Sequence, residues 1–243
     1  MPTLLSALGG ALSDLFRFRV LLIVILPILA AALLWLGIAI AFWEPINGWL
    51  TAGLTKLGIE QWLAGVEPKW IASALQVAID LLLYTTLVYL TALFFTALFA
   101  MPALVRIVAS NHYPLLARKQ GGGLFGSLLN AAIALIGFVA LWLLSLPLWF
   151  FGVGMLMPLI AAAYLNQRLF RFDALAEHAD REEMTHLFAR YPLGWWGLGV
   201  ITGLLQFIPF LNLFAPVFAA LAFIHYGLAR LESLRSRSAP TGN

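Results

Sequence analysis

The stretch Gln206-Phe-Ile-Pro-Phe-Leu-Asn-Leu-Phe-Ala-Pro216 lies in a longer run, Tyr191 to Ala229, that contains no Asp, Glu, Lys or Arg. Its two prolines each remove a backbone donor and disfavour helix in the preceding residue. At 39 residues the run is long for one membrane crossing and short for two, because one crossing takes about 20 residues. It predicts two half-length helices that meet at a broken tip within a membrane, where protein or a water-filled cavity satisfies the backbone.

The composition places the whole chain in a lipid bilayer. Of its 243 residues, 63% are hydrophobic and 10% are charged, whereas soluble domains have about 25% charged residues. We expect a single all-α membrane domain over residues 1–243. The absence of cysteine excludes disulfides and thiol catalysis. The basic residues lie beside the apolar runs, which indicates orientation of the membrane spans rather than nucleic-acid binding.

The first half of the chain predicts two full transmembrane helices. Residues 1–19 form an amphipathic lead that we expect to lie in the membrane interface, with Leu4, Leu8, Leu12, Leu15 and Phe16 on one face. Residues 20–43 and 71–108 are the expected crossings, because each contains an uncharged run of 24 or 25 residues. Residues 44–70 form a semi-polar connection with short amphipathic pieces.

A second hairpin is predicted over residues 120–168. Gln120 to Gln167 is uncharged for 48 residues, and Pro147 nearly bisects it, which predicts arms from Phe125 to Ser145 and from Leu148 to Arg168. Both arms are long enough to cross the bilayer or to stop partway. The triple glycine at 121–123 is interpreted as a flexible loop, because no Gly-Lys-Ser/Thr sequence follows it.

The most polar segment, residues 169–190, predicts a cytoplasmic surface helix. On such a helix His178, Glu182 and His186 would share a face, either as metal ligands or as ordinary water-facing residues. Because the segment holds no further strong ligand, we expect no metal and no cofactor. Residues 191–229 form the hairpin described first, and residues 233–243 predict a disordered tail.

The distribution of Lys and Arg predicts cytoplasmic N and C termini. There are two Lys and Arg residues in the lead, three in the 106–119 loop, four in the 168–190 segment and three in the tail, whereas residues 44–70 contain only two. The hairpins at 120–168 and 191–229 then start and end inside, which favours re-entrant, hemi-penetrating elements. Their helix N-termini carry free N–H groups that can hold an anion. The runs lack the chain of ionisable residues that a proton relay needs.

Two short motifs carry a resemblance to a known family. Ile208-Pro-Phe-Leu-Asn-Leu-Phe214 followed by Pro216 resembles the Ile-Pro-x-Leu-Asn-Leu-Phe-x-x-Pro segment of CysZ-type sulfate permeases, with Pro216 one residue early. Val24-Ile-Leu-Pro27 is similar to the start of that family's first crossing. The same superfamily includes the etoposide-induced membrane proteins of eukaryotes, which are not usually described as transporters.

The resemblance implies a homo-oligomeric protein of the bacterial inner membrane that admits sulfate, built from two crossings and two hemi-penetrating hairpins. In that family a Gly-Leu/Ile-Arg element ahead of the first crossing is associated with sulfate binding. This chain instead has Asp14-Leu-Phe-Arg-Phe-Arg19. Arg17 and Arg19 could replace the missing element, since guanidinium groups suit oxyanions, or could serve only as positive-inside anchors.

Two functional hypotheses follow. The first is channel-like uptake of sulfate or a similar small oxyanion, for which the expected binding or path residues are Arg17, Arg19, Asn130, Pro147, Pro209, Asn212 and Pro216. Asn212 could instead cap a helix within the hairpin turn. The second is a non-transporting membrane scaffold or partner-binding protein. We expect no enzymatic activity, because no catalytic constellation lies inside the apolar runs.

Overall fold

The computed structural model describes residues 3–150, 152–209 and 211–238, and every regular element in them is a helix. The all-α prediction is therefore confirmed. In chain order the helices are α1 (Leu4–Leu15), α2 (Phe18–Ala41), α3 (Trp43–Lys56), α4 (Ile59–Ala64), α5 (Lys69–His112), α6 (Gly123–Trp149), the short 3-10 helix η1 (Val153–Leu156), α7 (Met157–Ala176), α8 (Arg181–Arg190), α9 (Pro192–Leu205), the 3-10 helix η2 (Leu211–Leu213) and α10 (Ala215–Ser238).

The chain divides into two compact units, each described here by itself. Unit 1 comprises residues 1–21 and 99–243, and unit 2 comprises residues 22–98. Within the described residues, four helices have the length and composition to cross a membrane: Phe18–Ala41, Lys69–Ala92, Phe125–Trp149 and Ala215–Ser238. The protein is therefore a membrane protein with several apolar helices. That the two units act as one membrane domain stays a prediction.

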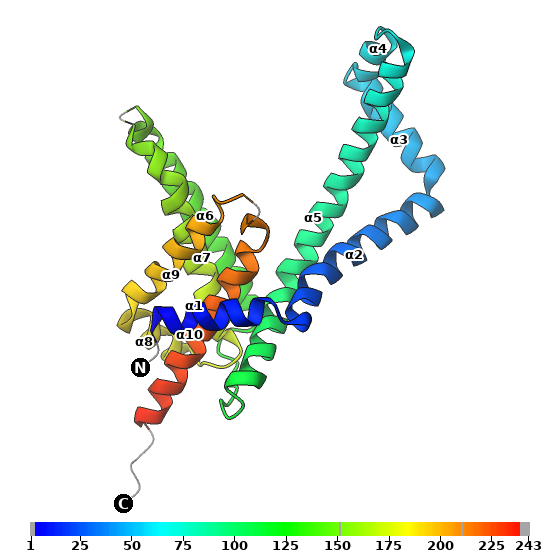
Figure 1. Cartoon of the computed structure of the whole chain (residues 1–243). Coiled ribbons are helices and arrows are strands. Elements are labelled where there is room, and N and C mark those ends of the chain that lie inside the picture. Colours follow the sequence, from blue (N-terminus) through cyan, green and yellow to red (C-terminus); the bar gives the residue numbers. More distant parts are fainter. Residues whose placement is uncertain (1–2, 151, 210, 239–243) are drawn as a thin grey trace, which may run out of the picture. The chain divides into compact units, whose positions relative to one another are not determined.

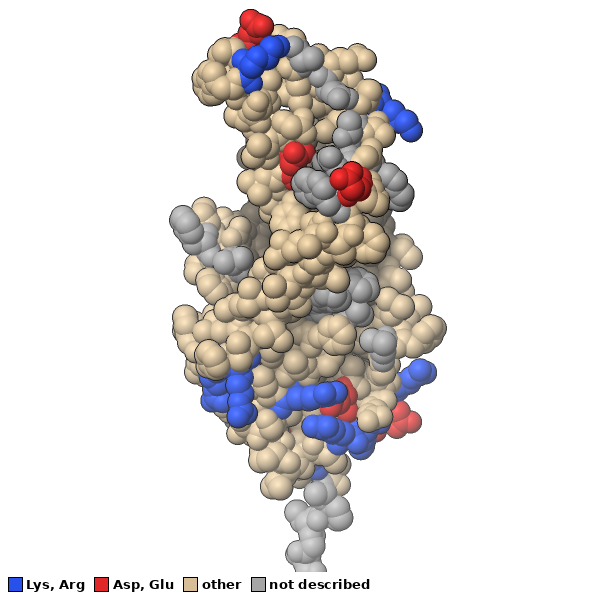
Figure 2. All heavy atoms as spheres, turned by 90° about the vertical axis from the view of Figure 1, so that its right-hand side faces the viewer, with Lys and Arg blue, Asp and Glu red and all other residues tan. Residues whose placement is uncertain are grey.

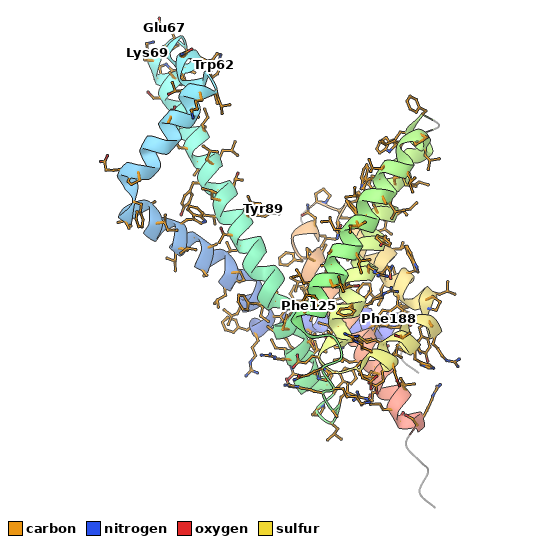
Figure 3. The ribbon with its side chains drawn as sticks, turned by 180° about the vertical axis from the view of Figure 1, so that it is seen from behind. Trp62, Glu67, Lys69, Tyr89, Phe125 and Phe188 are labelled. Carbon is orange, nitrogen blue, oxygen red and sulfur yellow. The ribbon has the colours of Figure 1, made fainter. Side chains whose placement is uncertain are left out.

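Unit 2 is built from α2, α3, α4 and the first part of α5. The ranges where full crossings were expected are occupied by α2 and by α5, which is one uninterrupted 44-residue helix. Trp35 Nε1 on α2 donates to Thr91 Oγ1 on α5 at 2.9 Å, and the Tyr84 hydroxyl donates to the Ala32 carbonyl at 3.2 Å. Helices α3 and α4 lead to the end of this unit where α5 begins. Trp62 of α4, Glu67 of the connection and Lys69 at the start of α5 mark this end (Figure 3).

Helix α10 is the centre of unit 1, where it packs against α1, α7 and α9 (Figure 1). It is buried on almost every side, and the side chains from Leu221 to Leu228 are all buried. Trp195 of α9 is fully buried, stacks on Phe223 at 6.1 Å and meets the Tyr226 ring edge-on at 5.0 Å. These aromatic contacts fix α9 against α10.

The side of α1 that is buried in unit 1 contains two alanines and one leucine. A capping box starts the helix, in which Thr3 Oγ1 accepts from the Ser6 N–H at 3.1 Å. Ala7, Ala11, Asp14 and Leu15 are buried, whereas Leu5, Leu12 and Phe16 are more than half exposed. Of the face of the amphipathic lead that was expected to be apolar, Leu12 and Phe16 are exposed, Leu4 and Leu8 are partly buried and Leu15 is buried, while Ala7 and Ala11 allow the close approach to α10.

The turn of the first hairpin lies later in the sequence than predicted. Pro147 is inside α6, which continues to Trp149, and the second arm, α7, runs from Met157 to Ala176 rather than from Leu148 to Arg168. The connection turns at Gly152, whose φ of 75° is favoured only for glycine. Proline is tolerated near the helix end, because few backbone hydrogen bonds follow it.

In the second hairpin the helical break coincides with the prediction. Helix α9 ends at Leu205, α10 begins at Ala215, and only η2 interrupts the segment between them. Pro209 lies in this segment, Asn212 lies in η2 and Pro216 is the second residue of α10, where a missing donor costs little. All three side chains are exposed.

The polar segment 169–190 is not one surface helix. Its first part continues α7 to Ala176, and α8 starts afresh at Arg181. Asp180 and Glu183 form a capping box, in which Asp180 Oδ1 accepts from the Glu183 N–H at 2.8 Å. His178 therefore precedes α8 and is buried, whereas Glu182 and His186 are exposed on α8. The shared face proposed for these three residues was wrong.

The tail prediction was wrong in its first part. Helix α10 continues to Ser238, so residues 233–238 are helical rather than disordered. Arg235 supplies the reason, because its guanidinium donates to Glu183 and to the carbonyls of Ala117 and His178. Residues 239–243 of the predicted tail lie outside the described residues.

We predict that Ala11→Leu destabilises unit 1, because Ala11 has no exposed surface in the α1–α10 contact. Overpacking of this kind typically costs about 1–3 kcal/mol. Thermal unfolding of the purified protein in detergent measures the change. The control is Leu12→Ala on the exposed face of α1, which should leave the melting temperature nearly unchanged, and equal effects of both variants would contradict the packing described.

Candidate functional site

A cavity of about 390 Å³ lies within unit 1, between α6, α7, α8 and the glycine-rich loop that precedes α6. Its walls carry three arginines, one asparagine, one threonine and a set of apolar and glycine residues. The lining residues are Gly121, Gly122, Gly126, Leu129, Asn130, Ile133, Arg168, Arg171, Phe172, Arg181, Met184, Thr185 and Phe188. Phe188 contributes from α8 (Figure 3).

The cavity is positively charged. Arg168, Arg171 and Arg181 line it, and no Asp or Glu is among the described lining residues. Arg168 Nε is buried without a hydrogen-bond partner in the described part of the chain. Buried polar groups are normally hydrogen-bonded, and Arg168 Nε is an exception among the described residues. The guanidinium groups that line the cavity match the acceptor oxygens of a small oxyanion.

Arg171 is held in a dehydrated position against an aromatic ring. Its guanidinium carbon lies 4.6 Å from the centre of the Phe188 ring. Burial, together with the charge of Arg168, lowers the pKa of Arg171 to about 10. The side chain therefore remains protonated at neutral pH while lacking much of its hydration, a combination that increases the benefit of an anionic partner.

The helical repeat explains why these side chains converge. Arg168 and Arg171 are three residues apart on α7, so they emerge on the same face. Asn130 on α6 anchors this face, because its Nδ2 donates to the Arg168 carbonyl at 3.0 Å. Helix α8 turns back at Asp180 and places Arg181 and Phe188 on the opposite wall.

The loop expected to be flexible forms a docked wall of the cavity. The N–H groups of Gln120, Gly121 and Gly122 donate to the carbonyls of the α7–α8 corner at 2.9–3.1 Å. A Cβ atom on Gly122 would lie 2.6 Å from the Cβ of Ala176, so only glycine allows this approach. The triple glycine is thus a packing feature rather than a hinge.

An ionic clamp, formed by Lys119, Asp180, Glu183 and Arg235, fixes the loop to both α8 and α10. Lys119 Nζ lies 2.8 Å from Asp180 Oδ2 and 2.8 Å from Glu183 Oε1. Arg235 approaches Glu183 with two nitrogens, each at 2.9 Å. Burial acts to raise the pKa of Glu183. The hydrogen bonds from Arg235, Lys119 and the Asp180 backbone outweigh this effect and lower that pKa to about 2.

The predicted residues Arg17 and Arg19 lie outside the described cavity lining. Arg17 Nε is 2.8 Å from Oδ1 of Asp14, a carboxylate with no exposed surface, so its charge is already paired. The Arg19 side chain is exposed. An anion-binding role for these two arginines stays a prediction, as it does for Pro147, Pro209, Asn212 and Pro216. Of the predicted residues, Asn130 alone is among the described lining residues.

Sequence reasoning treated Arg168, Arg171 and Arg181 only as orientation signals. Arg168 and Arg171 follow an apolar run at helical spacing, and Phe172 lies beside them. This pattern is also typical of positive-inside anchors. The distinguishing feature is that α8, which begins after the capping box at Asp180, contributes Arg181 and Phe188 to the cavity that Arg168 and Arg171 also line.

Basic side chains of unit 1 gather at one end of the face in Figure 2. In a comparison with protein families, a family model described as Sulfate transporter CysZ/Etoposide-induced protein 2.4 matches residues 7–216. No curated protein and no solved structure matches the chain. The matched range contains the described cavity lining.

The clamp predicts a pH-dependent stability. The pKa of Glu183 is lowered from 4.5 to about 2, so its stabilising contribution is complete above about 4.5 and is lost as the pH falls toward about 2. Glu183→Gln should destabilise the protein at neutral pH by about 1.5–3 kcal/mol, the contribution of a hydrogen bond to a charged group. It should also weaken the acid dependence of the melting temperature. Glu182→Gln, exposed on the same helix turn, is the matched control, and identical pH profiles for the two variants would contradict the clamp.

Proposed function

The chain belongs to the family described as Sulfate transporter CysZ/Etoposide-induced protein 2.4, and from this premise we propose that it is a channel-like route for sulfate or a similar small oxyanion. We place it in the bacterial inner membrane with cytoplasmic N and C termini, as the excess of Lys and Arg beside the corresponding runs suggests. The proposal includes no enzymatic role.

One observation supports this proposal above the others: the arginine-lined cavity. Three guanidinium groups surround about 390 Å³ without an acidic lining residue among those described, and one of their nitrogens is buried without a partner. Sulfate offers four acceptor oxygens and would neutralise part of this charge. Because the site lies at the polar end of α7, we assign it to the cytoplasmic side of the route, where the ion is held before release.

The path through the bilayer is assigned to the two hairpins. In this proposal α6–α7 and α9–α10 are re-entrant, and their tips, at Gly152 and near Pro209, lie within the membrane together with Pro147 in the last turn of α6. Asn212 and Pro216 would line the route beside Pro209, in the break between α9 and α10. We further propose that several copies assemble around this route, as the family resemblance implies.

Arg17 and Arg19 receive a secondary role in this proposal. Arg17 is paired with Asp14, so it attracts an anion less than the cavity arginines do. Arg19 is exposed and free to contribute to the local potential. Substituting Arg17 and Arg19 therefore tests whether the anion binds at these two arginines, as the family resemblance implies, or in the cavity.

Flux of radiolabelled sulfate into liposomes that contain the purified protein tests the proposal. Arg168→Ala and Arg171→Ala should each lower saturable flux by roughly 10- to 100-fold, because a charge-assisted hydrogen bond contributes about 1.5–3 kcal/mol. Arg17→Ala/Arg19→Ala should lower it less. Arg190→Ala, an exposed arginine of α8 outside the described cavity lining, is the matched control and should retain full flux.

The outcomes distinguish the two hypotheses stated at the sequence level. No flux above that of empty liposomes, from protein that remains folded, would contradict transport of sulfate and favour the scaffold or partner-binding role. Normal flux in both cavity variants would contradict the assignment of the cavity. A larger loss in Arg17→Ala/Arg19→Ala would move the anion site to the end of α1.

Cysteine accessibility tests the re-entrant hairpins, since the chain has no native cysteine. Pro147→Cys and Pro209→Cys should resist a membrane-impermeant thiol reagent added from the periplasmic side, because both tips are proposed to end within the bilayer. Glu67→Cys, on the connection expected to face the periplasm and highly exposed, should react readily. Strong periplasmic labelling at both proline positions would rule out the hemi-penetrating arrangement.

A further inference from the structure

Three metal-ligating side chains that lie far apart in the sequence converge in unit 1. Asp14 lies near the end of α1, His112 is the last residue of α5, and His225 is in the middle of α10. His225 Nε2 is 3.0 Å from Asp14 Oδ2, and His112 Nε2 is 3.2 Å from the same oxygen. One ligand atom from each residue lies within 4.8 Å of the other two.

These separations fit a shared metal ion. Zn²⁺ binds imidazole nitrogen and carboxylate oxygen at about 2.0–2.2 Å, which places neighbouring ligand atoms of a tetrahedron roughly 3.3 Å apart. The two nitrogen–oxygen separations are already close to this value. Two histidines and one carboxylate also form a recurring ligand set for divalent first-row metals, with one or more positions left open.

The two oxygens of Asp14 have different partners. Oδ1 lies 2.8 Å from Arg17 Nε, whereas Oδ2 makes the shortest contacts with both histidines. Carboxylate ligands of metals are commonly held by such an outer hydrogen bond. Arg17 therefore orients the carboxylate and leaves Oδ2 available as a single-oxygen ligand.

The surrounding residues position His225. The Tyr113 hydroxyl donates to the His225 carbonyl at 3.4 Å, and the imidazole lies against Gly10, where a Cβ atom would be 2.9 Å from Nδ1. The rings of His112 and His225 meet edge to face with centres 4.9 Å apart. Both imidazoles thus present Nε2, rather than a ring face, to the carboxylate.

The three side chains differ in exposure, so the cluster is buried on one side and open to solvent on the other. The Asp14 side chain has no exposed surface and that of His225 is 7% exposed, whereas that of His112 is 34% exposed. An ion can therefore reach the cluster past His112. Buried carboxylates are normally paired or bound to metal. The Asp14 carboxylate contacts the imidazoles of His112 and His225 in addition to the Arg17 guanidinium.

We propose that Asp14, His112 and His225 form a binding site for a divalent first-row transition metal, with Zn²⁺ as the best match, that joins α1, the end of α5 and α10. This departs from the sequence-based expectation of no metal, which considered only His178, Glu182 and His186. The site is separate from the arginine-lined cavity, since none of its three residues is among the described lining residues. Its existence does not depend on the transported ion.

Metal binding to the purified full-length protein, prepared without a polyhistidine tag, tests the site. After chelator treatment and dialysis, titration with Zn²⁺ and with Co²⁺ should give one bound ion per chain, and Co²⁺ should develop the visible absorption of a low-coordination site. His112→Ala and His225→Ala should each weaken binding by more than about 10- to 100-fold, the loss caused by removing even an outer-sphere partner. His186→Ala, an exposed histidine on α8, should bind as the wild type does.

The readouts also separate a metal site from a hydrogen-bonded clasp. Bound Zn²⁺ should raise the melting temperature of the wild type and of His186→Ala, but not that of His112→Ala. Because Asp14 is buried and its substitution can prevent folding, the partly exposed His112 provides the decisive variant. Equal metal binding by the wild type and by His112→Ala/His225→Ala, or loss of binding only in His186→Ala, would overturn the proposal.

Discussion

The burial of α10 on nearly every side is the constraint on which unit 1 depends. Helix α1 packs on one side of it, α7 and α9 on others, and Arg235 near its end reaches the α7–α8 corner. In a membrane the hydrophobic effect does not drive helices together, so close packing and hydrogen bonds must do so. The alanines of α10, Ala219, Ala220 and Ala222 among them, permit this packing because they let neighbouring backbones approach. Both the cavity and the Asp14 cluster lie on helices that α10 holds in place.

Properties that depend on composition and run length could be predicted from the sequence. The uncharged runs indicated α2 and α5, and the two prolines indicated the break between α9 and α10, because each of these features acts locally on the backbone. The turn between α6 and α7 was misplaced because Pro147 is compatible with a helix end, whereas Gly152 has the left-handed conformation that reverses the chain. The start of α8 was missed although Asp180-Arg-Glu-Glu183 is a capping-box sequence.

The candidate sites could not be predicted to the same degree, since each unites residues from separate helices. The anion cavity needs α8 to fold back over α7, and the Asp14 cluster joins residues 211 positions apart. Sequence reasoning overlooked both sites, because Asp14, His112 and Arg181 lie at helix ends outside the apolar runs and their partners come from other helices. Helix ends are where a membrane protein can bring charged side chains together while its lipid-facing segments stay apolar. The family match assigns residues 7–216 to a family but says nothing about individual side chains. The two candidate sites are therefore argued from the residues of this chain.

The contact between α1 and α10 has a consequence for the order of synthesis. Helix α1 leaves the ribosome before the other helices described here, and α10 leaves it after them. Until α10 emerges, the Asp14 carboxylate lacks one of its two histidines, and the alanine face of α1 lacks the helix that covers it. During this interval the exposed leucines of α1 can contact lipid. The buried Asp14 carboxylate on the other side of the helix has no such partner in lipid. Unit 1 is therefore completed only once α10 has been synthesised, and a chain cut short before α10 would leave a buried acid without the surroundings that make its burial possible.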